Sequence, residues 1–132
     1  MLLVDTNVLI AVLEDDPEWA DWSIAQLRGQ SKVHPLAINP IIYAELSLTF
    51  SKVEALDNTI ENLGLSLLEL SRPALFLAGK AFVQYRRQGG KAGNVLADFF
   101  IGAHAAVLGC SLLTRDARRY RNYFPSVGLI TP

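Results

Sequence analysis

The chain has 132 residues, of which 51% are hydrophobic and 19% charged, and its mean hydropathy is +0.25. This length suits one domain with a sizeable buried core, and the apolar content excludes a disordered chain. The single cysteine, Cys110, excludes a disulfide scaffold and a cysteine-ligated zinc site. No secretory signal is visible, because Asp5 interrupts the only apolar start, and the longest uncharged stretch, 99–114, is too short to span a membrane. We therefore expect one soluble, cytoplasmic domain over residues 1–132.

The formal net charge of −1 conceals an asymmetry along the chain. Residues 1–66 carry 10 acidic and 3 basic residues, a net charge of −7, whereas residues 67–132 carry 3 acidic and 9 basic residues, a net charge of +6. No linker divides the two halves, so one folded body has an acidic and a basic region. The basic region suits a polyanion, and chance scatter on a solvated surface explains the charge equally well.

In the first half of the chain, strands and helices are predicted to alternate in this order: strand 2–4, helix 8–13, helix 16–28, strand 33–38, helix 39–50 and helix 51–64. Pro17 suits the first turn of the second helix, and Gly29 is expected to end it. Pro35 weakens the second strand. The segment Ser51–Glu54 matches a capping box, which predicts that a new helix starts there.

The second half continues the alternation: strand 65–70, helix 71–88, helix 95–108, strand 111–114, a basic turn or short helix 115–123, and strand 127–130. Asn94 is the expected cap of the helix over 95–108, and Gly109 is its expected stop. Short apolar strands that alternate with helices predict an α/β fold with a parallel sheet.

Four acidic residues stand in apolar surroundings. Asp5 and Asp116 follow predicted buried strands, and open α/β sheets form their sites beyond the carboxyl ends of such strands. Asp98 and Glu45 interrupt apolar helices, where an unpaired carboxylate is costly. Carboxylates that converge either raise their own pKa values or bind cations, and oxygen ligands favour Mg²⁺ or Mn²⁺.

Each acid also has a structural interpretation. Asp5 could cap the following helix, Glu45 could pair with a distant arginine, Asp98 could lie in the first turn of its helix, and Asp116 could be a turn residue. The joint pattern of the four favours a metal site that activates water at a phosphate.

Four sequence blocks carry a resemblance to a known family. They are Val4–Ile10, Ala44–Leu46, Leu96–Ala105, and Leu112–Asp116 followed by Tyr120 and Tyr123–Pro125. Their order, their spacing and the total length resemble the PIN-domain ribonucleases, and among these the VapC-type toxins of bacterial toxin–antitoxin pairs. The resemblance covers essentially the whole chain, so it implies a single PIN domain over residues 1–132.

The resemblance implies a three-layer α/β/α fold with a short, mainly parallel sheet, and a metal-dependent endoribonuclease. By position, Asp5 and Asp98 are the main ligands of Mg²⁺, for which Mn²⁺ can substitute. Glu45 and Asp116 would ligate a second metal or hold metal-bound water. The neighbouring polar residues Asn7 and Thr114 would orient the acids. The family also implies a homodimer and a cognate VapB-type antitoxin that blocks the site.

Two basic segments are candidates for RNA contact. One contains Arg86, Arg87 and Lys91, and the other contains Arg115, Arg118 and Arg119, interleaved with Tyr120 and Tyr123. Arginine suits bidentate phosphate contact and tyrosine can stack on unpaired bases. The alternatives are a solvated loop and a solvated helix face, or an intramolecular role in which Arg115 pairs with one of the acids.

Several other residues have a structural interpretation and a functional one. His104 is interpreted as structural or as part of a dimer surface, because it lies about 240° around the helix from Asp98. The small residue Gly102 shares the face of Asp98 and would let a backbone or substrate approach. Trp19 and Trp22 are core residues or anchors for an antitoxin helix.

Two other classes of function compete with the nuclease. A non-catalytic PIN-fold domain would bind RNA or protein, but it would be expected to lose some of its costly carboxylates. A phosphotransfer enzyme or receiver would need an Asp-x-Asp-x-Thr pattern or an acid pair with a lysine, and the segment 5–7 offers neither.

Overall fold

The computed structural model describes residues 1–91, 93 and 95–132. Its strands are β1 (Leu2–Val4), β2 (Leu36–Ile38), β3 (Leu65–Leu67), β4 (Ser111–Leu113) and β5 (Leu129–Ile130). Its helices are α1 (Thr6–Leu13), α2 (Ala20–Ser31), α3 (Pro40–Ser47), α4 (Val53–Asn62), α5 (Arg72–Arg87), α6 (Leu96–Leu108) and α7 (Arg118–Tyr123). The predicted alternation of strands and helices is confirmed.

All strand pairs of the sheet are parallel, and the strand order is β3-β2-β1-β4-β5. The chain first builds outward from β1 through β2 to β3, and then crosses to the other side of β1 to add β4 and β5. The strand order therefore reverses between β1 and β4, which pair along Leu2 to Val4 and Ser111 to Leu113. This reversal is the place where open parallel sheets form a crevice at their carboxyl edge.

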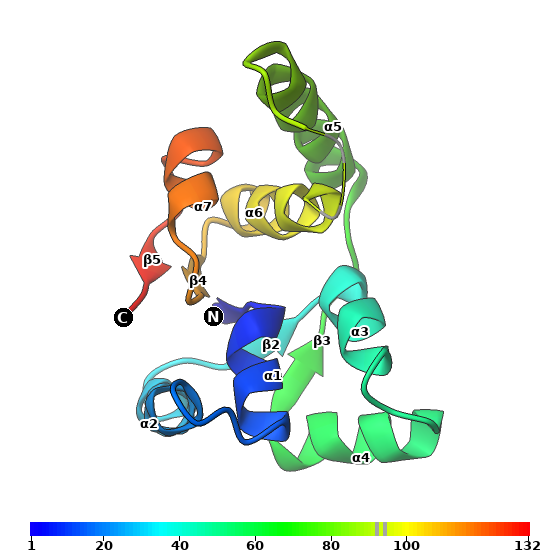
Figure 1. Cartoon of the computed structure of the whole chain (residues 1–132), viewed down its shortest axis with the longest axis vertical. Helices are drawn as coiled ribbons and strands as arrows, with labels where there is room; N and C mark the ends of the chain where they lie inside the picture. The colour runs from blue at the N-terminus through cyan, green and yellow to red at the C-terminus, as the bar shows by residue number, and fades with distance from the viewer. Residues whose placement is uncertain (92, 94) are drawn as a thin grey trace.

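Helices cover the sheet on both sides (Figure 1). In this view α5, α6 and α7 lie above the strands, and α1, α2 and α4 lie below them. The central strands are buried on both faces, so β1, β2 and most of β4 are apolar and fully covered. The expected three-layer α/β/α fold is confirmed.

Several predicted boundaries are wrong. The second strand begins at Leu36 because Val33 lies in an exposed turn, and the third ends at Leu67. Helix α2 begins only at Ala20, and the residues before it form a turn in which one Asp16 oxygen accepts the backbone N–H groups of Glu18 and Trp19. It also continues past Gly29.

The helix ends show which predicted caps form in the structure. The capping box is wrong, because α4 begins at Val53, one residue later than Ser51 requires, with Lys52 in the cap position and no side-chain cap bond. By contrast, the side chains of Asn39 and Ser71 accept the expected bonds at the starts of α3 and α5. The predicted cap Asn94 lies outside the described residues. Gly109 ends α6 in the left-handed conformation (φ 66°), as predicted.

Helix α6 is buried all round in its middle and exposed at its two ends. Phe99 and the run Ile101–Ala105 are buried, whereas Leu96, Val107 and Leu108 are exposed. The apolar sequence on nearly all sides of this helix predicts that it is buried, and this prediction is confirmed for the middle of the helix and wrong at its ends. No helix in the described part of the chain combines the length and apolar character that a membrane crossing needs.

Candidate active site at the switch between β1 and β4

Asp5 stands at the carboxyl end of β1 and is only 4% exposed. One oxygen, Oδ2, accepts hydrogen bonds from the Thr114 hydroxyl at 2.7 Å and the Tyr120 hydroxyl at 2.9 Å, with the Asn7 amide at 3.4 Å. Thr114 follows β4, which pairs with β1, so the strand reversal places a residue from late in the chain beside Asp5. Among the residues that the structure describes, the donors to this buried carboxylate are neutral polar side chains, and no basic side chain pairs with it.

Burial and, to a smaller extent, the charge of Asp98 raise the pKa of Asp5, while the hydrogen bonds from Thr114 and Tyr120 lower it; the net result is a pKa of about 6, above the ordinary 3.8. The net upward shift means that the folded chain destabilises the ionised carboxylate despite its three donors. A nearby cation would relieve this cost.

Glu45 projects from α3 and is partly buried, and its Oε1 accepts a 2.6 Å hydrogen bond from the Thr6 hydroxyl. Burial raises its pKa, the bond from Thr6 lowers it, and the charge of Asp98 raises it. The predicted alternative that Glu45 pairs with an arginine is therefore wrong, since its partner is Thr6. Thr6 lies in the first turn of α1, directly after Asp5, so the two acids are linked through neighbouring residues.

Asp98 lies in the first turn of α6, and its side chain is 28% exposed. Its Oδ2 pairs with the guanidinium of Arg119 from α7 at 2.5 Å. Burial raises the pKa of Asp98, Arg119 lowers it and the charge of Asp116 raises it. The sequence suggests Arg115 as an intramolecular partner of one of the acids, but in the structure Arg119 is the arginine that pairs with an acid, Asp98.

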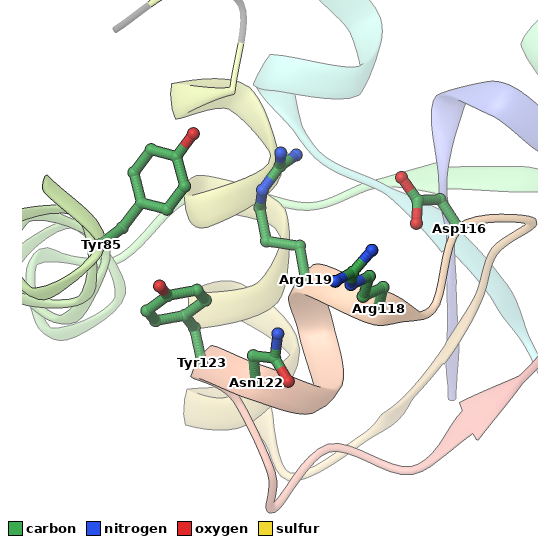
Figure 2. Close-up of a pocket in the computed structure, with 6 residues that line it drawn as sticks. All are labelled: Tyr85, Asp116, Arg118, Arg119, Asn122 and Tyr123. Carbon is green, nitrogen blue, oxygen red and sulfur yellow. The ribbon is translucent and has the colours of Figure 1, made fainter. Parts of the chain in front are cut away.

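Asp116 is the most exposed of the four acids and lies in the loop between β4 and α7. Its backbone N–H donates to the Thr114 hydroxyl oxygen at 3.1 Å, so the hydroxyl that supports Asp5 also fixes this loop. Figure 2 shows Asp116 on one side of Arg119 and Tyr85 on the other. The loop is also held by Asn7, whose side chain accepts from the backbone N–H of Arg115 at 3.1 Å.

The four acids form a chain of charges centred on Asp98. Its charge raises the pKa values of Asp5 and Glu45, and its own pKa is raised by the charge of Asp116. Within residues 1–91, 93 and 95–132, no three carboxylate, histidine or cysteine side chains are grouped closely enough to hold one metal ion. Arg119 instead supplies the positive charge at Asp98. The donor set, four carboxylates of which three have raised pKa values, fits a hard divalent cation.

The predicted phosphate-binding residues divide into three positions. Arg86 and Arg87 are exposed in the last turn of α5, with exposed Lys91 beyond it. Arg118 and Arg119 lie on α7 beside Asp116. Arg115 lies apart from them, with its guanidinium 4.8 Å from the ring centre of Trp19.

Tyr120 does not stack on bases, because its ring is 1% exposed and its hydroxyl serves Asp5. That prediction is wrong for Tyr120. Sequence reasoning also missed Thr6 as a site residue, although its position next to Asp5 in a first helical turn was a usable signal.

The remaining candidates make contacts within the chain, and the role of Trp19 and Trp22 as anchors for an antitoxin helix stays a prediction. His104 is 1% exposed and its Nδ1 lies 3.2 Å from the Asn39 amide nitrogen, so the structural interpretation is correct and the dimer surface is wrong for its side chain. Gly102 does admit a close neighbour, but it is the ring of Phe124 from the same chain, 2.3 Å from where a Cβ would lie. Trp19 and Trp22 form an edge-to-face pair, and Trp22 packs against the core.

A parallel α/β sheet with carboxylates gathered at its strand reversal defines the class of protein: an α/β domain with an acidic site at the carboxyl edge. The family model of the PIN domain matches residues 2–125, and the chain belongs to the PIN domain family. No curated protein matches the sequence at a significant level.

Several solved structures share the fold. The chain is similar to one in VapBC2 from Rickettsia felis bound to a promoter DNA fragment, with a TM-score of 0.76, 20% identity and coverage of 99% of this chain and 98% of that one. A chain in VapBC-1 from nontypeable Haemophilus influenzae matches with a TM-score of 0.74 and 21% identity, over 98% of this chain and 96% of that one. A chain in DNA-bound VapBC from Salmonella typhimurium matches with a TM-score of 0.72 and 20% identity, over 98% of this chain and 96% of that one. At these identities the likeness establishes the fold.

Proposed function

We propose that this chain is a Mg²⁺-dependent endoribonuclease, a hydrolase of RNA phosphodiester bonds, and that it acts as the toxin of a type II toxin–antitoxin pair. The observation that carries the proposal is the set of four carboxylates at the strand reversal, in which the charge of Asp98 raises the pKa values of Asp5 and Glu45 and the charge of Asp116 raises that of Asp98. Membership of the PIN family and the similarity to VapBC structures support it.

Asp5 and Asp98 are the proposed main ligands of Mg²⁺ or Mn²⁺, and Glu45 and Asp116 would complete the set for a second ion or hold its water. When bound, the cation supplies Lewis-acid chemistry and a reactive water at the phosphate. The chain's own contribution is orientation: Thr114, Tyr120 and Asn7 fix one oxygen of Asp5, and Thr6 fixes one oxygen of Glu45.

The basic half of the chain would hold the RNA backbone. Arg118 and Arg119 stand beside Asp116, and Arg86, Arg87 and Lys91 extend the positive surface along the end of α5. Arginine can bind a phosphate with two parallel hydrogen bonds.

The toxin role implies partners. We propose a cognate VapB-type antitoxin, a homodimer of this chain and a cytoplasmic location, because the chain is similar to structures named as VapBC complexes. A short reading frame directly upstream of the gene would be the candidate antitoxin, and co-expression with it, followed by size-exclusion chromatography with light scattering, tests the antitoxin and the dimer together.

The activity is tested by incubating purified protein with total RNA and Mg²⁺ or Mn²⁺. Asp5→Asn and Asp98→Asn should abolish cleavage, EDTA should do the same, and Asp21→Asn, which alters an exposed acid on α2, should not. Discrete cuts that depend on the metal and on both acids support the nuclease. Absence of cleavage by folded, antitoxin-free, metal-bound protein would favour the non-catalytic RNA- or protein-binding domain.

A further inference from the structure

Beside the acidic site the surface is hollowed between the C-terminal end of α5 and α7. The cavity measures about 280 Å³ and is lined by Tyr85, Asp116, Arg118, Arg119, Asn122 and Tyr123 (Figure 2). Its volume lies just below the ~300 Å³ lower end of small-molecule clefts, so it suits a fragment the size of one nucleobase or sugar.

The aromatic wall of this pocket is firmly held. The rings of Tyr85 and Tyr123 meet edge to face, with centroids 5.8 Å apart and planes at 79°, and both pack against Phe99. The Tyr123 hydroxyl donates to Gln88 at 2.8 Å, and the Tyr85 hydroxyl donates to the backbone carbonyl of Lys91 at 3.1 Å. Because both rings are already held in place, a ligand that packs against a ring face would not have to immobilise these side chains.

The other side of the pocket is charged and polar. The Arg119 guanidinium lies 5.7 Å from the ring centre of Tyr85 while it binds Asp98, so it connects the pocket to the acidic site. Arg118 and Asn122 are exposed on the same helix. A ring face, two guanidinium groups and an amide that both donates and accepts are the chemistry by which proteins bind an unpaired nucleotide.

We propose that this pocket binds one unpaired nucleotide of the RNA next to the cleaved bond. The base stacks on the ring of Tyr123 with its edge toward Tyr85, Asn122 meets its hydrogen-bonding edge, and Arg118 and Arg119 hold its phosphate. The inference rests on the proposed function for its biological meaning, and it requires the bound nucleotide to be unpaired, because a base inside a duplex cannot enter such a pocket. An acidic peptide would satisfy the arginines and leave the ring corner unused.

The test measures binding without cleavage. Adenosine 5′-monophosphate is titrated into the protein in EDTA, and the backbone amide signals of residues 118–123 are followed by NMR, with inorganic phosphate as the parallel probe. The nucleotide is expected to shift these signals more than phosphate at equal concentration. Tyr123→Leu should weaken nucleotide binding about tenfold, since each base–aromatic stack is typically worth that much or more.

Two further variants separate the pocket from general damage. Asn122→Ala alters an exposed helical position and should weaken nucleotide binding by a smaller factor with the fold intact. Tyr43→Leu is the matched control, because Tyr43 is also partly buried and also donates its hydroxyl to a side chain, here Asp57 at 2.7 Å. It should bind the nucleotide as the native chain does.

The outcomes are distinct. Equal shifts from nucleotide and phosphate, or unchanged binding in Tyr123→Leu, would reduce the pocket to an anion site and overturn the proposal. Loss of antitoxin binding in Tyr123→Leu, with no nucleotide binding in the native chain, would assign the pocket to a peptide and also overturn it. Nucleotide binding in a protein that cuts no RNA would retain the pocket and reject the nuclease, and cleavage without nucleotide binding would do the reverse.

Discussion

The acidic site has two ends that are built differently. At the β1 end, Asp5 is 4% exposed and held by hydroxyl donors from β4 and α7, and Glu45 is held by the hydroxyl of Thr6. At the α6 end, Asp98 is partly exposed and its partner is the long side chain of Arg119. Neutral hydroxyls orient a carboxylate and leave its charge uncompensated, whereas a guanidinium compensates the charge. Under the proposed function, the first end would take up a metal ion directly, whereas the second would first have to release Arg119 from Asp98.

The largest effect is expected at the β1 end. Asp5→Asn should lower RNA cleavage by at least about 100-fold, since it removes a proposed metal ligand. The same variant should be more stable than the native chain at pH 8, by up to about 3 kcal/mol, because burial raises the pKa of Asp5 from 3.8 to about 6.

The sign follows from proton binding. Between pH 3.8 and 6 the folded chain holds a proton on Asp5 that the unfolded chain has lost, so native stability falls as the pH rises through this window. Urea unfolding of both proteins at pH 4 and pH 8 checks this: the advantage of Asp5→Asn should disappear at pH 4. Asp116→Asn, at an exposed acid, is the control, and an equal gain there would contradict the burial argument.

Sequence reasoning identified the acids of this end and two polar partners of Asp5, Asn7 and Thr114, but it missed Tyr120 and Thr6. The apolar run before Asp5 and the run before Thr114 fix two strands, and parallel strands place their ends at one edge, so the meeting of these residues was predictable. Tyr120 was not predictable as a donor to Asp5. Its place on α7 depends on how a six-residue helix packs against α6, and no local pattern in the chain encodes that packing.

The same limit applies at the other end. Arg119 lies 21 residues after Asp98, and the basic run around it offers four arginines with similar local sequence. Only the tertiary arrangement selects Arg119 for Asp98 and places Arg115 over Trp19. One helix boundary was missed locally: the residues after Asp16 form a turn whose N–H groups the Asp16 side chain caps, and helix α2 itself begins only at Ala20.

Tyr120→Phe sharpens the comparison by removing one hydroxyl from Asp5. A hydrogen bond to a charged group contributes about 1.5–3 kcal/mol, so the variant should lose about 2 kcal/mol of stability at pH 8. The loss should shrink at pH 4, where Asp5 is protonated. Tyr123→Phe removes a hydroxyl that serves exposed Gln88 and should change stability little. Equal losses of stability in the two variants would show that the hydrogen bond from Tyr120 to Asp5 contributes no more to stability than the one from Tyr123 to Gln88.

Arg119→Gln tests whether the α6 end exchanges cations. Removing the guanidinium from Asp98 Oδ2 should tighten the binding of Mn²⁺ by about tenfold, the effect of one competing charge in a partly exposed site, and should weaken the binding of RNA. Water-proton relaxation in a Mn²⁺ titration measures the first effect. Arg118→Gln, which alters an exposed arginine on the same helix, should weaken RNA binding without tightening the metal. Unchanged Mn²⁺ affinity in Arg119→Gln would contradict the exchange.

The smallest effect concerns the support of α3, the helix that carries Glu45. Asn39 Oδ1 accepts from the backbone N–H of Ile42, so its amide nitrogen faces His104, and Nδ1 of His104 must accept the 3.2 Å hydrogen bond as a neutral ring. Burial lowers the pKa of His104 below 6.5. Protonation therefore favours the unfolded chain, and stability should fall as the pH drops below 6.5.

The expected loss is about 1 kcal/mol, the typical net contribution of one neutral hydrogen bond. Urea unfolding at pH 7.5 and 5.5 measures it, with His104→Gln as the matched variant, because glutamine keeps a hydrogen-bonding group and does not titrate. The difference between native and variant stability should be larger at pH 7.5 than at pH 5.5. Since Asp5 is more protonated at pH 5.5 in both proteins, its contribution cancels in this comparison, and a difference independent of pH would show that His104 is not held as a neutral acceptor.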